Sequence, residues 1–250
     1  MSRVNQSRSF HQKPRPSLSV PKPAIRLQDA VIGRLRKLIK KGYSSSLSQG
    51  FGREYANILK LFGDYQQEVL KANSYTVTCK EGCGVCCCHW AEDVYSFEAR
   101  TIVDFLKKNH LPRLKTIVSR LQRDVAWLNK IHHAVRTAKG LESGGACSAD
   151  IDPYDIALSS FYQLRRPCPL LGSDMACTVY PIRPLTCRIY VSFSPARFCL
   201  PQNILGGKAM TYLLDLEKGA MELFDTLHFM YDECDGDTGL RSMLLKLLSR

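Results

Sequence analysis

A twelve-residue stretch, CKEGCGVCCCHW at residues 79–90, constrains the fold more than any other part of the chain. Five of the 11 cysteines lie in it, at Cys79, Cys83, Cys86, Cys87 and Cys88. Gly82 and Gly84 flank Cys83, and glycine lets a backbone curl tightly enough to direct several sulfurs to one region. Because clustered thiolates are soft ligands, the stretch predicts a loop that binds zinc or an iron–sulfur centre.

A second group of cysteines lies in a proline-rich stretch, PCPLLGSDMACTVYPIRPLTCRIY at residues 167–190. It contains Cys168, Cys177 and Cys187. Neither stretch has enough apolar residues to order itself, whereas a bound metal contributes folding free energy directly. We therefore expect the two groups to fold onto one centre or onto closely spaced centres.

Cysteine usage and hydropathy indicate a reducing environment. The number of cysteines is odd and their density is below that of a small disulfide scaffold. No apolar segment typical of a secretory signal follows Met1, and no uncharged apolar run is long enough to span a bilayer. The expectation is a cytoplasmic protein without a transmembrane segment, in which thiols are free to bind metal.

The net charge of +12 is concentrated at the start of the chain. Residues 1–42 hold eleven Lys or Arg and one acid, Asp29, so +10 of the charge lies there. Residues 1–24, rich in Ser, Arg and Pro, are predicted to be a disordered basic extension, and four prolines argue against an amphipathic transit peptide. Residues 25–50 are predicted to form a basic amphipathic helix and a loop. Two roles are open for this helix. Its apolar stripe packs on the domain, or the helix contacts an acidic partner, which is an anionic membrane surface or nucleic acid.

Hydrophobic periodicity predicts a mainly α fold. Residues 51–250 are expected to form one helical domain with cysteine-rich, proline-rich metal-binding loops and at most a few short strands. Helices are expected over 51–72, 112–139, 152–166, 208–231 and 240–248, and a further helix that Asp93 or Ser96 caps is expected to end at Asn109. Short strands are expected over 178–180 and 188–193. The first-turn position of Glu98 suits the helix dipole.

Three other interpretations of the cysteines are less consistent with the sequence. The spacing C-x3-C-x2-C of Cys79, Cys83 and Cys86 matches the motif of radical adenosylmethionine enzymes, but repeated strand–helix units do not follow it. A zinc finger needs two regularly spaced ligand pairs, which adjacent Cys86 and Cys87 do not provide. Buried unligated thiols fit poorly in loops, which bury little apolar surface.

The segments CKEGCGVCC, PCPLL and CTVYPIRPLTCR together resemble the YkgJ-type cysteine-cluster (CxxCxxCC) family, described as a zinc- or iron-chelating domain. The resemblance covers a core motif at residues 79–190. It implies metal ligation by the matching cysteines, which are Cys79, Cys83, Cys86, Cys87, Cys168, Cys177 and Cys187, within a framework of Tyr180, Arg183, Pro184 and Arg188. Cys88 extends the usual double cysteine to a triple. Cys147, Cys199 and Cys234 lie outside the pattern, with Cys199 the best reserve ligand.

A metal-binding protein is thus the expected function, with an iron–sulfur cluster favoured over zinc. Arg183 and Arg188 either balance the charge of the thiolates or bond carbonyls of the proline-rich loop. His89 is a candidate to complete the site. The alternatives are a methyltransferase-like enzyme, by analogy with flagellin lysine N-methylases, and an adaptor that uses its basic tail. The methyltransferase-like alternative is weakened because the sequence shows no glycine-rich strand-to-helix loop of the kind that binds a methyl donor.

Overall fold

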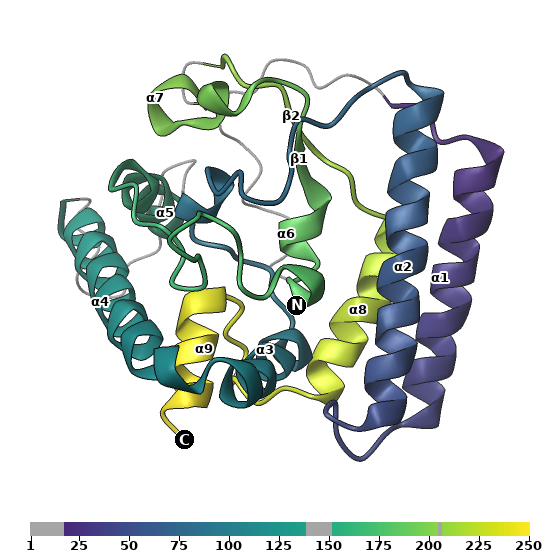
Figure 1. Ribbon diagram of the computed structural model, residues 1–250, viewed down its shortest axis with the longest axis horizontal. Helices are drawn as coiled ribbons and strands as arrows, with labels where there is room; N and C mark the ends of the chain where they lie inside the picture. Colours follow the sequence, from purple (N-terminus) through teal and green to yellow (C-terminus); the bar gives the residue numbers. More distant parts are fainter. Residues whose placement is uncertain (1–17, 139–151, 205–206) are drawn as a thin grey trace.

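Two groups of helices stand on either side of the cysteine-bearing loops (Figure 1). The computed structural model describes residues 18–138, 152–204 and 207–250. One group consists of α1 (Lys22–Lys41), α2 (Gln49–Ala72) and α8 (Lys218–Met230). The other consists of α3 (Ser96–Asn109), α4 (Leu114–Ala138), α5 (Pro153–Gln163) and α9 (Leu240–Leu248). The predicted mainly α class is confirmed.

Short elements connect the two groups. These are the 3-10 turns Cys86–Cys88, Leu111–Arg113, Tyr180–Ile182 and Ala196–Cys199, and the short helices α6 (Thr186–Ile189) and α7 (Pro201–Ile204). β1 (Tyr190–Ser192) pairs antiparallel with β2 (Thr211–Leu213), with Val191 opposite Tyr212. Among the described residues these two strands form the whole of the β structure that extends beyond single bridges.

The largest core lies between α1, α2 and α8. Val31, Leu35 and Leu38 of α1 are buried against α2 and α8, whereas the cations near the end of the helix are exposed. Apolar positions spaced three and four residues apart fall on one side of a helix, so the stripe packs inward and the charges point to water. The packing role predicted for this helix is confirmed, and contact with an acidic partner stays a prediction.

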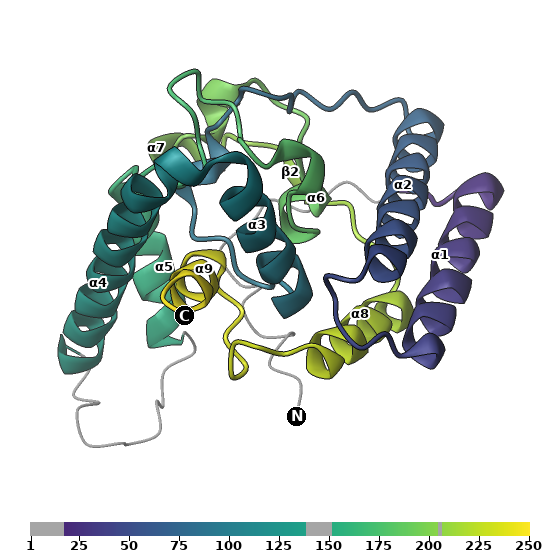
Figure 2. The same cartoon turned by 60° about the horizontal axis from the view of Figure 1, so that its bottom comes forward.

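A second core fills the space between α3, α4 and α9, and a third lies under α5. Ile102, Leu121 and Leu244 belong to the second, and Trp90 with Phe161 to the third. Figure 2 shows α9 lying between α4 and α3, which explains why its apolar residues are almost all buried. None of the helices in the described ranges is long and apolar enough to cross a membrane.

The beginning of the chain is better anchored than the sequence indicated. α1 starts at Lys22, three residues before the expected position, and Asn73 at the end of α2 accepts from and donates to the backbone of Ser19. Residues 1–17, like Cys147, lie outside the described part of the chain. The basic extension therefore stays a prediction for those residues.

Two predicted elements are wrong. Residues 208–217 do not belong to a helix, because Thr211 and Tyr212 pair with β1 and α8 begins only at Lys218. Residues 178–180 do not form a strand, because the chain turns into a 3-10 helix at Tyr180 before Pro181. In both cases the deciding contacts come from residues distant in sequence or from proline, which fixes φ and lacks an N–H.

Candidate metal centre

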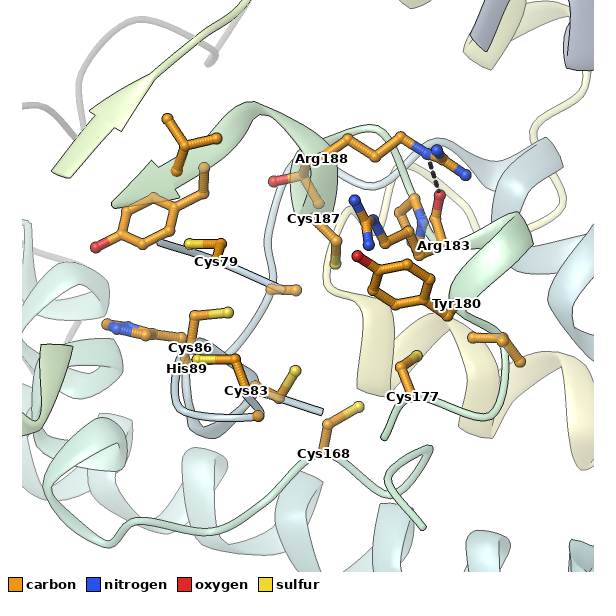
Figure 3. A pocket seen from close by; sticks show the side chains of 18 of the residues that line it. Cys79, Cys83, Cys86, His89, Cys168, Cys177, Tyr180, Arg183, Cys187 and Arg188 are labelled. Atoms are coloured by element: carbon orange, nitrogen blue, oxygen red, sulfur yellow. Dashed lines mark hydrogen bonds between the residues drawn. The ribbon is translucent and has the colours of Figure 1, made fainter. Parts of the chain in front are cut away.

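All seven cysteines of the predicted set line one cavity of about 550 Å³ between the two groups of helices. They approach it from the loop after α2 and from the proline-rich stretch that ends in α6 and β1 (Figure 3). Tyr180, Arg183, Pro184 and Arg188 line the same cavity. The cysteines of the chain that the structure describes are free thiols. The fold therefore brings the two groups of cysteines to one cavity, and their binding of a metal stays a prediction.

The glycines of the first loop have the conformation that the sequence predicted. Gly82 and Gly84 have φ values of 81° and 61°, in the left-handed region where a Cβ is disfavoured. A Cβ on Gly84 would also lie 2.7 Å from Met175 Cε and 3.2 Å from the Met175 carbonyl oxygen. Gly84 thus lets the first loop pack against the loop between Cys168 and Cys177.

The three adjacent cysteines point in different directions. Cys86, Cys87 and Cys88 form a 3-10 turn, which has three residues per turn, so neighbouring side chains diverge. Cys86 and Cys87 line the cavity, whereas Cys88 does not. Arg241 and Arg165 are the charged neighbours of the Cys88 thiol. The structure therefore places the usual double cysteine at the cavity and the extra third cysteine away from it.

Backbone hydrogen bonds join the second loop to the first. The Cys168 N–H donates to the Cys87 carbonyl over 2.8 Å, and an isolated β-bridge links Leu171 with Cys177. On the other side of the cavity, Thr78 donates to the Ser192 carbonyl, and the Ser192 N–H donates to Cys79 Sγ over 3.2 Å. Hydrogen bonds therefore connect each group of cysteines to the chain segment that carries the other group.

The two framework arginines have different surroundings. Arg188 Nε donates to the Arg183 carbonyl at 3.0 Å, and its Nη2 donates to the Pro181 carbonyl at 2.7 Å, which is the loop-bonding alternative (Figure 3). The Arg183 guanidinium stacks on the Tyr180 ring, 3.9 Å from its centroid, and its buried Nε has no partner among the described residues. Arg183 therefore has a hydrogen-bond donor left at the cavity.

A buried ion pair contributes to the cavity wall, because Arg241 is one of the residues that line the cavity. The Arg241 side chain is buried, and its Nη2 donates to the carbonyls of Cys87 and Arg166. Its Nη1 lies 3.2 Å from Asp124 Oδ2, which makes an ion pair whose geometry is not that of a hydrogen bond. Arg166 Nε donates to the other carboxylate oxygen of Asp124, Oδ1, at 2.6 Å. The sequence held a signal for this pair, because Asp124 occupies the buried stripe of α4 between Leu121 and Leu128.

Glu98 is a further residue whose role the sequence did not reveal. Its carboxylate accepts from the Tyr95 N–H in the first turn of α3, as a first-turn acid should, but it is only 3% exposed. It also accepts from Tyr55 Oη of α2 and, at 2.8 Å, from the N–H of Leu185, two residues before Cys187. Burial raises the pKa of Glu98 to about 7 against the lowering effect of these donors. Glu98 connects α2, α3 and the second cysteine loop.

Burial raises the pKa of most of the thiols at the cavity. The pKa of Cys79 and that of Cys177 rise to about 11, and that of Cys187 lies well above its ordinary value. Cys79 and Cys187 are exposed residues by accessible surface, and both line the cavity. Cys86 differs, because a hydrogen bond from the Cys87 thiol lowers the pKa of Cys86 to about 7, assisted by the charge of Arg183. Metal binding must displace protons from the other thiols.

His89 lies at the edge of the cavity but is engaged with aromatic rings. Its ring stacks on Tyr162 with 3.5 Å between the centroids. Burial, with the charge of Arg241, lowers the pKa of His89 to about 4, so the imidazole is neutral near pH 7. Its buried Nε2 has no partner among the described residues. In Figure 3 the ring points away from the labelled sulfurs, so His89 does not stand with the predicted ligands.

The thiols surround the cavity without converging on one point. Among the described residues, no group of three or more His, Cys, Asp or Glu side chains is arranged to hold a single metal ion. The donor set is nevertheless that of a metal site, because seven thiols line one space together with Arg183, whose buried Nε has no partner among the described residues. Thiols of this kind fit zinc or an iron–sulfur cluster.

Comparison with known families agrees with this donor set. The pattern of the CxxCxxCC family, described as "Putative zinc- or iron-chelating domain", matches residues 78–204, which is 127 of the 250 residues. The chain belongs to the CxxCxxCC family. No curated protein and no solved structure matches the chain. The match includes every cysteine of the predicted set and also Cys199.

Proposed function

We propose that the protein is an iron–sulfur protein whose cluster is held by thiolates at the 550 Å³ cavity. One observation supports this choice above the others: seven thiols line one space, yet in the described ranges no three metal-binding side chains stand close enough for a single ion. One zinc ion would use only four of them, drawn close around it. An iron–sulfur cluster is larger, and its cysteines bind different irons, so the sulfurs stand farther apart.

The neighbours of the thiols also suit a cluster. A thiolate-bound cluster carries negative charge, and the half-buried Arg183 side chain lies beside Cys187 with its buried Nε free to donate (Figure 3). The Ser192 N–H already donates to Cys79 Sγ, which is the kind of backbone bond that stabilises ligand sulfur. When bound, such a cluster accepts and releases single electrons and adds folding free energy; this chain's residues hold it, shield it and balance its charge.

The identity of the metal is tested by purification without air after expression with ample iron. We expect a brown protein with broad visible absorption that bleaches on reduction, and with iron and acid-labile sulfide in equal amounts. Colourless protein that carries stoichiometric zinc under the same conditions would overturn the proposal and favour a structural zinc site.

The ligand assignment is tested by substitution. Cys83→Ser and Cys187→Ser should each lower metal content and thermal stability, because each removes a thiol at the cavity. Cys234→Ala is the matched control: Cys234 is a free thiol but is buried in the core of α3, α4 and α9, away from the cavity. Equal metal content in the three variants would refute the assignment.

An adaptor role stays a second candidate because of α1. Arg36, Lys37, Lys40 and Lys41 are exposed on the side of the helix opposite its packed stripe. A cationic surface of this kind attracts an anionic membrane surface or nucleic acid, and the attraction weakens as salt is added. Such binding would accompany the metal centre rather than replace it.

A further inference from the structure

The thiols at the cavity fall into two groups. Figure 3 shows Cys79, Cys83 and Cys86 on one side and Cys168, Cys177 and Cys187 on the other. The electrostatic surroundings of the thiols agree with the picture. The neighbouring thiols that act on Cys79 are Cys86, Cys83 and Cys199, whereas those that act on Cys187 are Cys168, Cys86 and Cys177. Cys86 lies near the boundary, since it acts on members of both groups.

Cys87 belongs to the second group although it comes from the first loop. Its backbone carbonyl accepts the Cys168 N–H at 2.8 Å. Besides the adjacent Cys86, the thiols that act on Cys87 are Cys168 and Cys187. Cys87 thus completes a set of four with Cys168, Cys177 and Cys187.

Cys199 stands next to the first group. Its Sγ donates to Ser192 Oγ at 3.4 Å, and the N–H of the same Ser192 donates to Cys79 Sγ at 3.2 Å. The thiols that act on Cys199 are Cys83 and Cys86. Cys199 is buried and, unlike the other seven cysteines, is not among the residues that line the cavity; its backbone carbonyl accepts from Tyr162 Oη.

We propose that the protein holds two four-thiolate iron–sulfur centres, one on each group of cysteines. The first is assigned to Cys79, Cys83, Cys86 and Cys199, and the second to Cys87, Cys168, Cys177 and Cys187. The inference rests on the proposed function and adds to it the number of centres and an eighth ligand, Cys199. One four-iron cluster uses four cysteines. A single centre would leave unused about half of the thiols that the fold has gathered.

The division also explains how the polar groups are distributed. Arg183 lies beside Cys187 in the second group and near Cys86 at the boundary, where one cation faces both centres. In the first group the Ser192 N–H donates to Cys79 Sγ, and the Ser192 hydroxyl oxygen accepts from Cys199 Sγ. Two adjacent anionic clusters repel each other, so a cation at their boundary stabilises the pair.

The number of centres is tested by counting iron and sulfide per chain after anaerobic reconstitution. The wild type should hold about eight of each. Cys79→Ser and Cys199→Ser, which alter the first group, should each keep about half, and so should Cys177→Ser and Cys187→Ser, which alter the second. Each group has two variants so that a failure to fold in one does not decide the outcome; circular dichroism identifies a folded variant.

Electron paramagnetic resonance of the reduced protein gives an independent readout. Two neighbouring reduced clusters couple magnetically, so the wild-type spectrum should be broadened, and folded Cys199→Ser and Cys177→Ser should each show one uncoupled signal. Cys234→Ala serves as the control and should match the wild type. About four irons per wild-type chain, with none lost from folded Cys79→Ser and Cys199→Ser, would overturn the two-centre inference and leave the proposed function standing. Wild type with zinc and no iron would instead refute the proposed function.

Discussion

Removal of Asp124 should be among the most destabilising single changes outside the cysteines. Asp124→Ala leaves the Arg241 guanidinium, whose side chain is 2% exposed, charged and without its acidic partner. Breaking a buried ion pair in this way costs about 3–5 kcal/mol. Arg166 adds little to that cost, because its side chain is 28% exposed and regains water. The stacking of Arg241 on Trp90 and Phe161 exists in both proteins and cancels in the difference.

The measurement is the free energy of unfolding in urea, followed by the fluorescence of buried Trp90 under anaerobic conditions. The matched control is Glu233→Ala, which breaks the Arg100–Glu233 pair, both of whose side chains are about one-third exposed. The control should cost below about 1 kcal/mol. In the double variant Asp124→Ala with Arg241→Leu the buried charge is gone, so it should be more stable than Asp124→Ala alone. An Asp124→Ala cost no greater than that of the control would refute the reasoning.

Three further predictions concern Glu98, Glu92 and the beginning of the chain. Glu98→Ala should lower both metal content and stability, by about 1–3 kcal/mol, because it leaves the buried N–H of Leu185 unpaired near Cys187; unchanged metal content would argue against its positioning role. Burial raises the pKa of Glu92 from its ordinary 4.5 to about 7, so the folded state binds this proton more tightly and stability falls as pH rises from about 5 to 8. Glu92→Gln keeps hydrogen-bond partners for the Tyr154 and Thr238 hydroxyls, and it should reduce the loss of unfolding free energy between the two pH values by about 1–3 kcal/mol, as measured in urea titrations. The same loss in the variant as in the wild type would refute this prediction. Deletion of residues 1–17 should leave metal content unchanged and weaken binding to anionic vesicles at low salt, and a truncated protein that loses metal would show that these residues belong to the domain.

The resemblance to the cysteine-cluster family predicted the seven cysteines that line the cavity, and apolar spacing, which is local information, predicted most of the helices. Two glycines beside Cys83 specify the turn of the first loop, and the apolar spacing of residues 240–248 specifies α9 with the observed bounds. The strand at Thr211–Leu213 was missed because it exists only through pairing with β1, and that partner is not visible in the segment itself. Glu98 has a first-turn position that the sequence shows, but its contacts with Tyr55 and Leu185 depend on the packing of distant elements.

The packing of Gly84 against Met175 bears on the order in which the site is assembled during synthesis. The first cysteine loop is complete at Cys88, but the loop that covers it ends only at Cys187, and Cys187 follows Cys79 by 108 residues. At a translation rate of about 5–20 residues per second, this gap lasts on the order of 5–20 s. During that interval the first thiols have left the ribosome without the chain segments that wall the cavity. Metal delivered too early would meet an open loop, whereas a thiol-protecting carrier or a delay in metal delivery would let both loops close before the metal binds.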